Sequence, residues 1–220
     1  SCMIAKERLF ESRGSLSSAL ATDVANALQH HVRTKGSSCL AVSGGLTPKL
    51  FFETLSRFDV PWSRVTITLV DERQVPETDP RSNARLVREY LLQNTAAGAQ
   101  FVPLFDSPEA ENVGTLDVVV LGMGNDGHTA SFFPGGDNLG EALNPKTGKR
   151  IVTMSAPAAG EPRLKFTLPA LLDASLLCLH IEGQEKRDVL NKALGEGPAE
   201  AMPVRAVLRS KKPLTLYWCP

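Results

Sequence analysis

The sequence predicts an α/β protein built on an open, mostly parallel sheet with helices on both faces. Short runs of branched apolar residues recur without polar alternation, which is typical of strands buried on both faces. Segments with apolar residues at helical spacing lie between these runs. The clearest run, residues 116–121, leads directly into a glycine-rich loop. We expect a single α/β domain over residues 1–220, a length that permits a sizeable buried core.

The charges of the chain are balanced, with 24 Lys and Arg against 24 Asp and Glu. No excess of positive charge is available to hold nucleic acid or an acidic membrane surface, so we expect neither as a partner. The four cysteines show no C-x-x-C spacing, and reduced thiols in a cytoplasmic protein fit best. No basic segment followed by an apolar one opens the sequence, and no apolar run approaches the length of a membrane span. We therefore expect a soluble protein that is not exported.

The first third of the chain alternates between helix and strand signals. Apolar residues at helical spacing predict a helix over 15–32, with no catalytic role for the two histidines near its end. A strand is predicted over 39–42, followed by the turn Ser43-Gly44-Gly45-Leu46-Thr47-Pro48. Thr47 as N-cap, with Pro48 at the first helical position, predicts a helix start. Such a turn can direct backbone N–H groups at a phosphate, although it also occurs without a ligand.

Charged residues follow the next predicted strand, over 65–70. Asp71-Glu72-Arg73 would lie at the carboxyl edge of the sheet, where ligands bind in open α/β folds, but a surface turn could use the same residues. Ser82 is predicted to cap a helix. A small strand over 101–105 leaves only residues 106–115 before the next strand, which is short for a parallel crossover. Two explanations remain open, an irregular loop or a segment missing from the sequence.

The last third of the chain predicts three more strands and three more helices. The strands lie over 151–154, 175–182 and 214–219, and the helices begin at Thr167, Gln184 and Pro203. Residues 138–149 are interpreted as a polar excursion. His180, inside a strand, is interpreted as a core or interface histidine. Lys186 lies in a first helical turn, where a cation is unfavourable unless an anion is nearby.

The loop after residue 121 presents an acid and an imidazole two positions apart. Three glycines within six residues allow the backbone to turn sharply and to approach a ligand closely. An isolated Asp-Gly-His would most simply be a turn. Here it follows a buried strand through Gly-Met-Gly, which favours a site. Asp126 and His128 suit proton transfer near neutral pH.

The strands that end at residues 42, 70, 121 and 182 can bring their ends to one edge of a parallel sheet. The chain has no serine or cysteine in a nucleophile elbow and no His, Cys and carboxylate set with convincing metal spacing. The candidate phosphate ligands are Ser43, Gly44, Gly45 and Thr47, with the cations Arg73 and Lys186. Together these observations predict attack of water on a phosphorylated substrate.

The sequence resembles the 6-phosphogluconolactonases from about Leu16 to its end. The matching segments are 43–48, 71–76 with Asp79 and Ser82-Asn83, 121–131, and 183–186; the block D-G-H-T-A-S after L-G-M-G, with D-E-R upstream, is highly specific. The resemblance implies a fold similar to that of the sugar-phosphate isomerases and deaminases. It also implies hydrolysis of 6-phospho-D-glucono-1,5-lactone in the oxidative pentose phosphate pathway, in the cytoplasm, with no metal or organic cofactor. We expect a monomer or a weak homodimer.

Roles for individual residues follow from their chemistry and from the same resemblance. The residues themselves suggest the mechanistic hypothesis that His128 removes a proton from the attacking water and that Asp126 orients the imidazole. The substrate-binding residues that the resemblance implies are Ser43, Gly44, Gly45, Thr47, Asp71, Arg73, Asn125, Gly127, Arg163 and Lys186. The sequence departs from the family pattern in Phe132 for a usual Leu, in a shorter segment 106–115, and in Lys165 for a usual Thr or Ser. The last change leaves the ligand role of Arg163 open.

Two alternative functions fit the sequence less well. Amino-sugar-phosphate isomerases and deaminases carry a glutamate five positions after the histidine and D-E-Y upstream, where this chain has Phe133 and Arg73. A non-catalytic phosphosugar sensor usually brings a DNA-binding segment, for which this chain has neither the length nor the charge. The lactonase interpretation is therefore favoured.

Overall fold

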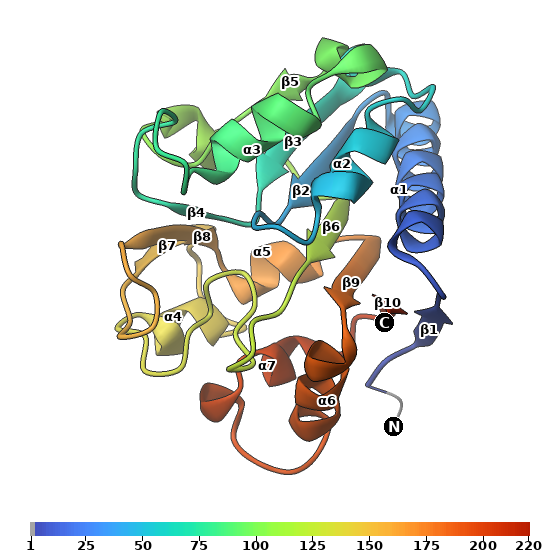
Figure 1. Ribbon diagram of the computed structural model, residues 1–220. Coiled ribbons are helices and arrows are strands. Elements are labelled where there is room, and N and C mark those ends of the chain that lie inside the picture. The colour runs from blue at the N-terminus through green and yellow to red at the C-terminus, as the bar shows by residue number, and fades with distance from the viewer. Residues whose placement is uncertain (1–2) are drawn as a thin grey trace.

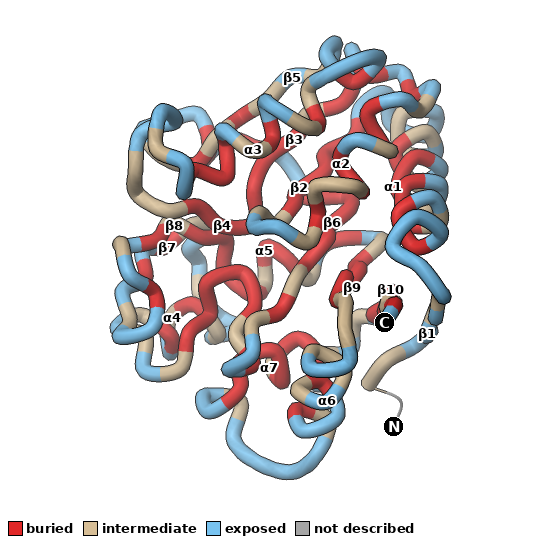
Figure 2. Tube along the Cα trace, viewed as in Figure 1, coloured by how far each residue is buried: buried red, intermediate tan, exposed pale blue. Residues whose placement is uncertain are grey.

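The computed structural model describes residues 3–220 and has a seven-stranded, fully parallel sheet at its centre (Figure 1). From one edge to the other the strands are β1 (Lys6–Leu9), β10 (Leu214–Cys219), β9 (Leu176–Glu182), β6 (Val118–Leu121), β2 (Ser38–Val42), β3 (Val65–Leu69) and β5 (Gln100–Phe101). Every residue of β2 and β6 is buried, as the apolar runs predict. Figure 2 shows this buried centre. The predicted α/β class is confirmed.

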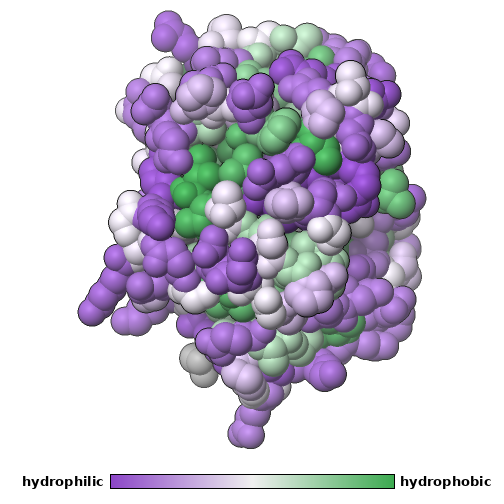
Figure 3. Space-filling view, turned by 90° about the vertical axis from the view of Figure 1, so that its left-hand side faces the viewer, coloured by the Kyte–Doolittle hydropathy of each residue, from purple (hydrophilic) through white to green (hydrophobic). Residues whose placement is uncertain are grey.

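Helices connect the strands, and the first of them packs against β2, β6, β9 and β10. They are α1 (Arg13–Lys35), α2 (Lys49–Leu55), α3 (Asn83–Tyr90), α4 (Leu139–Leu143), α5 (Leu168–Leu172), α6 (Gln184–Ala193) and α7 (Val204–Leu208). The predicted cap of α3 is confirmed, since the Ser82 side chain accepts from the Arg85 N–H at 3.1 Å. No helix in the described part of the chain is long and apolar enough to cross a membrane. The face in Figure 3 is mostly hydrophilic, with a hydrophobic area in its upper half.

A second sheet is not predicted by the sequence. It contains three antiparallel strands in the order β4 (Asp71–Arg73), β8 (Arg163–Phe166) and β7 (Ile151–Met154). The expectation that 71–73 simply end the preceding strand is therefore incomplete, because these residues form a strand of their own. In the register of β4 and β8, Arg73 lies opposite Arg163 and Asp71 lies opposite Lys165. The small sheet thus brings two distant segments with charged side chains together.

Other local expectations need correction. Thr47 is not the N-cap of α2, because Pro48 occupies that position and no side chain caps the helix. The strand expected over 101–105 is reduced to β5. Residues 106–115 form an ordered crossover that contains a short 3₁₀ helix, Pro108–Asn112, so a tight irregular connection suffices here. The segment expected to be a polar excursion contains α4.

Candidate active site

The loop after β6 is shaped by close backbone contacts. The Gly124 N–H donates to the His128 carbonyl at 2.9 Å, and the Gly127 N–H donates to the Gly124 carbonyl at 3.0 Å. Gly127 adopts φ +81°, a region that favours glycine. A Cβ on Gly124 would lie 2.1 Å from Cε1 of His128, so only glycine lets the imidazole approach the backbone this closely. The glycines of the loop therefore hold the His128 ring in place.

Asp126 and His128 form a hydrogen-bonded pair. The Asp126 Oδ1 lies 2.5 Å from the His128 Nδ1 and also accepts from the His128 backbone N–H at 3.0 Å. Burial raises the pKa of Asp126, but the hydrogen bonds from His128 and its charge outweigh burial, and the net pKa is lowered. The carboxylate therefore accepts from Nδ1–H, which leaves Nε2 as the basic nitrogen. Both side chains remain about one third exposed, at 38% and 32%.

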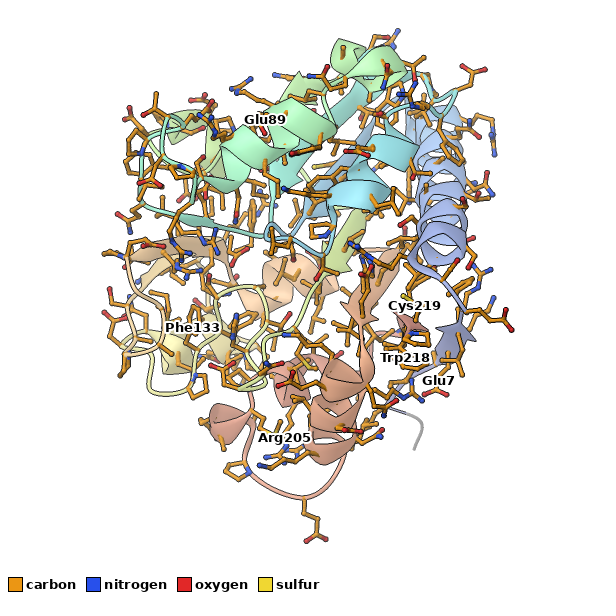
Figure 4. The ribbon with its side chains drawn as sticks, in the orientation of Figure 1. Glu7, Glu89, Phe133, Arg205, Trp218 and Cys219 are labelled. Carbon is orange, nitrogen blue, oxygen red and sulfur yellow. The ribbon has the colours of Figure 1, made fainter. Side chains whose placement is uncertain are left out.

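Residues after His128 in the chain pack against its ring and form a turn next to it. Phe133, labelled in Figure 4, stacks on the imidazole with ring centroids 4.4 Å apart, and the Arg163 guanidinium lies 5.0 Å from the Phe133 centroid. Ala130 and Ser131 both adopt left-handed backbone conformations, with φ of +49° and +58°. Such conformations persist only where the surrounding structure holds them. Here the fold holds a strained turn directly behind the imidazole.

Lys165 and Asp71 anchor that strained turn. The Lys165 ammonium is fully buried and donates to the Ala130 carbonyl at 2.7 Å, and the Ser131 hydroxyl donates to the Asp71 carboxylate at 2.5 Å. Burial holds the pKa of Lys165 well below its ordinary value, against the opposing charge of Asp71. Asp71 therefore has two roles: it lines the cavity, and it holds the turn at Ser131 by a hydrogen bond.

A cavity of about 100 Å³ lies in front of the His128 ring. It brings together six of the residues that the sequence singled out, and its lining is Ser43, Gly44, Asp71, Arg73, Asn83, Gly122, Met123, His128, Thr129, Ala130 and Arg163. A groove of about 430 Å³ shares Arg73 and Asn83 with it and is further lined by residues that include Glu89 of α3, labelled in Figure 4. The predicted meeting of strand ends is confirmed for β2, β3 and β6.

Two guanidinium groups give the cavity a positive character. The Arg73 Nη1 donates to the Arg81 carbonyl at 2.7 Å and to the Asn83 Oδ1 at 3.1 Å, and the Arg163 Nη2 donates to the Ala159 carbonyl at 2.7 Å. The Nε atoms of both arginines are buried with no hydrogen-bond partner among residues 3–220. Neither arginine forms a salt bridge within the described chain. Guanidinium groups that face a cavity without forming a salt bridge favour an anionic ligand, even with the Asp71 carboxylate in the same lining.

Asn83 is a cavity residue that the sequence predicted only as part of a matching segment, without a role. Its Nδ2 donates to the Asp71 carbonyl at 3.1 Å, and its Oδ1 holds Arg73. Glu72 positions this asparagine, since its carboxylate accepts from the N–H groups of Arg73, Asn83 and Ala84, each at 2.8 Å. Burial raises the pKa of Glu72 to about 7 despite these bonds. The signal in the sequence was the position of Asn83 directly after the helix cap.

The turn after β2 presents free backbone donors. Within the described residues, no acceptor is bonded to the N–H groups of Gly44, Gly45, Leu46 and Thr47. Gly45 adopts φ +89°. The turn also borders a separate hollow of about 90 Å³, which Thr47 lines. Consecutive unpaired N–H groups on a turn form a concavity that attracts anions.

Three predicted binding residues, Asn125, Gly127 and Lys186, line neither the main cavity nor the two other hollows. The Asn125 Nδ2 donates to the Glu185 Oε1 at 3.0 Å, which joins the loop to the first turn of α6, where Lys186 lies. Lys186 forms no hydrogen bond or salt bridge in the described part of the chain and lines none of the three hollows above. Gly127 serves the loop backbone, and its carbonyl accepts from the Val204 N–H at 2.8 Å.

The chain is similar to known proteins along nearly its whole length. The model of the family described as glucosamine-6-phosphate isomerases/6-phosphogluconolactonase matches residues 11–218. The chain belongs to this family. A 6-phosphogluconolactonase of Rhizobium meliloti (strain 1021) is 50% identical, with 99% of this chain and 100% of the relative covered. The crystal structure of a 6-phosphogluconolactonase from Shewanella baltica OS155 is 38% identical, with a TM-score of 0.94 and 100% of both chains covered.

The fold is shared more widely within the family. A monomeric glucosamine-6-phosphate deaminase has a TM-score of 0.75 at 19% identity, with 97% of each chain covered. At this identity the likeness concerns the fold alone. The distinction between isomerase or deaminase and lactonase therefore depends on the residues of the site.

Proposed function

We propose that this protein hydrolyses 6-phospho-D-glucono-1,5-lactone to 6-phospho-D-gluconate in the oxidative pentose phosphate pathway. The observation that carries the proposal is the Asp126–His128 pair, whose imidazole faces a cavity that also holds Arg73 and Arg163. A general base beside two guanidinium groups suits hydrolysis of a substrate that carries an anionic group. The printed names of relatives up to 50% identical support the same activity. We place this activity in the cytoplasm and expect a monomer or a weak homodimer.

The mechanism uses one imidazole twice. Nε2 of His128 removes a proton from water as the water oxygen forms a bond to C1 of the lactone. Asp126 accepts from Nδ1–H and stabilises the imidazolium that results. Backbone N–H groups of the loop hold the oxyanion on C1. When the tetrahedral intermediate collapses, the bond from C1 to the ring oxygen breaks and the imidazolium returns its proton to that oxygen. Nε2 is then again free to accept a proton.

The phosphate of the substrate needs its own binding site beside the catalytic pair, here called the seat. We assign it to the turn Ser43, Gly44, Gly45 and Thr47, with Lys186 approaching from α6 and Arg73 from β4. Asp71, Asn125, Gly127 and Arg163 complete the implied contact set, of which Asp71 and Gly127 act through the shape of the loop. The unpaired N–H groups of the turn support the assignment, because a phosphate monoester accepts several hydrogen bonds at once. Hydrolysis by this route requires no metal or organic cofactor.

One contact argues against the isomerase or deaminase alternative. The position five residues after His128 carries Phe133, and its ring stacks on the imidazole at 4.4 Å. A phenyl ring cannot transfer a proton during opening of an amino sugar. The same stacking restricts the imidazole to one plane, which favours a fixed general base.

Substitution of the two phosphate-binding cations tests the assignment of the seat. We expect Arg73→Ala and Lys186→Ala to raise KM for the phosphorylated lactone much more than they lower kcat. Lys192→Ala, which changes an exposed lysine near the end of the same helix, is the matched control. Steady-state kinetics with the unphosphorylated gluconolactone should respond little to any of the three variants. Equal KM values in Lys186→Ala and wild type would remove Lys186 from the seat.

A further inference from the structure

A buried histidine lines the hollow beside the turn after β2, and the mechanism above does not use it. The hollow has a volume of about 90 Å³ and is lined by the turn residues 42–48, by Phe52 and residues 120–122, and by His180 of β9. His180 is only 2% exposed. The sequence predicts a core or interface histidine here, and the burial agrees with that. Its position against a turn with four free N–H groups also suits it to bind a ligand.

The hydrogen bonds of His180 define which ring nitrogen is free. Nε2 lies 2.8 Å from the Glu182 Oε2, and the Glu182 Oε1 accepts from the Arg13 Nε at 2.8 Å. Burial raises the pKa of Glu182, but the contacts with His180 and Arg13 outweigh burial and lower it. Glu182 is therefore an ionised acceptor, and Nε2 carries the hydrogen. Nδ1 has no hydrogen-bond partner within residues 3–220, although the ring is almost fully buried.

The lining of the hollow selects an anion. No carboxylate lines it, while the turn with the free N–H groups does. The Ser43 hydroxyl also lies here, but it donates to the Val120 carbonyl at 3.1 Å and accepts from the Gly122 N–H at 3.2 Å. Its volume corresponds to about three water molecules, which is the scale of one tetrahedral oxyanion and too small for a sugar ring. The Nδ1 of His180 is placed for such a ligand.

We propose that His180 is a phosphate-binding residue of the substrate seat and that it binds the phosphate as an imidazolium. In that form Nδ1–H donates to a phosphate oxygen while Nε2–H donates to Glu182, and Arg13 holds Glu182 in place. Binding of a dianion then takes up one proton at His180, so affinity for the phosphate falls as the pH rises. This inference rests on the proposed function, because it assumes that the ligand in the seat is the phosphate of the substrate.

Few other charged groups face this histidine. Glu182 of β9 contacts it directly, and Arg13 of α1 acts through Glu182. On the neighbouring strand, Tyr217 is its register partner, but the Tyr217 hydroxyl is committed to Asp23 of α1 at 2.5 Å. From α2 the ring contacts Phe51, with centroids 6.4 Å apart. Glu182 is therefore the charged group in direct contact with the His180 ring.

Nitrogen-detected NMR of the histidine rings tests the proposal without any substitution. Sulfate is the first probe, because it stays dianionic across the pH range in which phosphate titrates. Saturating sulfate should raise the titration midpoint of His180 by about one pH unit, which by linkage means about tenfold weaker sulfate binding at high than at low pH. The signals of His30 and His31 should not move. A His180 signal that ignores both sulfate and inorganic phosphate overturns the proposal.

Kinetics of two matched variants provide the second readout. His180→Gln should raise the inhibition constants of sulfate and phosphate and the KM for the phosphorylated lactone by about tenfold, with little change in kcat. The control His31→Gln alters a histidine that contacts Ser175, just before the start of the same strand. If folded His180→Gln still hydrolyses the lactone and its inhibition constants for sulfate and phosphate are unchanged, the inference about His180 is contradicted. A protein that binds sulfate at His180 but does not hydrolyse the lactone instead contradicts the proposed function.

Discussion

Replacing Asp126 with asparagine separates the chemistry of the site from its stability. In the structure the carboxylate accepts from the ring Nδ1–H of His128 at 2.5 Å and from its backbone N–H at 3.0 Å. An asparagine can turn its NH₂ group toward Nδ1 and donate to it, which moves the ring hydrogen to Nε2. An Nε2 that already carries a hydrogen cannot accept one from water. Asp126→Asn should therefore disable the general base while preserving the shape of the loop.

The expected sizes of the two effects differ widely. General base catalysis contributes about 10²- to 10⁴-fold, so kcat should fall by that range, equivalent to about 3 to 5 kcal/mol in the barrier. The effect on folding should be small, because the pair is about one third exposed and solvent screens it. Exposed ion pairs contribute about 1 kcal/mol at most, which corresponds to a shift of about 2–4 °C in Tm for a chain of this size.

The assay compares Asp126→Asn, His128→Gln and the double variant. Because both residues act in one proton transfer, the double variant should be no slower than His128→Gln alone. Lactone hydrolysis would be followed by proton release after subtraction of the spontaneous rate, and Tm by circular dichroism. Additive losses in the double variant, or an Asp126→Asn protein with unchanged kcat, would refute the role given to this pair.

Three further predictions concern the surroundings of the site. Burial raises the pKa of Glu72 to about 7, so the unfolded chain loses this proton first as the pH rises. The free energy of unfolding should therefore fall by up to about 3 kcal/mol between pH 4.5 and 7. In urea unfolding, Glu72→Gln should not show this pH-dependent loss. A Cβ on Gly44 would lie 2.0 Å from the Asn83 Oδ1, so Gly44→Ala should raise KM about tenfold, whereas Gly140→Ala, which meets nothing within 4 Å, should not. Burial raises the pKa of the Cys178 thiol to about 12, and thiol reagents at pH 8 should label it only after unfolding.

The parallel sheet was predictable because its strands are buried on both faces. The runs that form β6 and β9 are rich in Val, Leu and Ile, and short runs of this kind are typical of strands in a parallel sheet that is covered on both faces. The charged edge strand β1 gives no such signal, because its residues are mostly exposed and only the neighbouring β10 defines it. Edge strands depend on their partner more than on their own composition.

The small sheet was missed for a related physical reason. β8 carries Arg163 and Lys165 on a four-residue strand next to prolines, and polar residues with prolines are typical of loops. Both side chains are nevertheless buried, since they are stabilised by carbonyl groups of the Ala159 and Ala130 turns. Tertiary partners of this kind leave no periodic trace in the sequence. Thr47 failed as a helix cap because the turn instead leads into Pro48.

The site itself was predicted in part. The Asp126–His128 pair, Ser43, Gly44 and Arg73 could be placed at one edge because the carboxyl ends of parallel strands meet there. Arg163 was implied only by the family resemblance and lies on β8 of the small antiparallel sheet. The role of Asn83 as the contact that holds Arg73 required the structure, since it depends on how α3 packs on β4. The contact of Lys186 with the ligand stays a prediction.

Hydrolysis of freshly prepared 6-phospho-D-glucono-1,5-lactone is the measurement that tests the central claim most directly. The reaction should be followed with EDTA present against the spontaneous background, with glucosamine 6-phosphate as the control substrate. We expect rapid turnover of the lactone, unaffected by EDTA, and no release of ammonia from the amino sugar. A folded protein that binds phosphosugars tightly but leaves the lactone at its spontaneous rate would contradict the account and indicate a sensor instead.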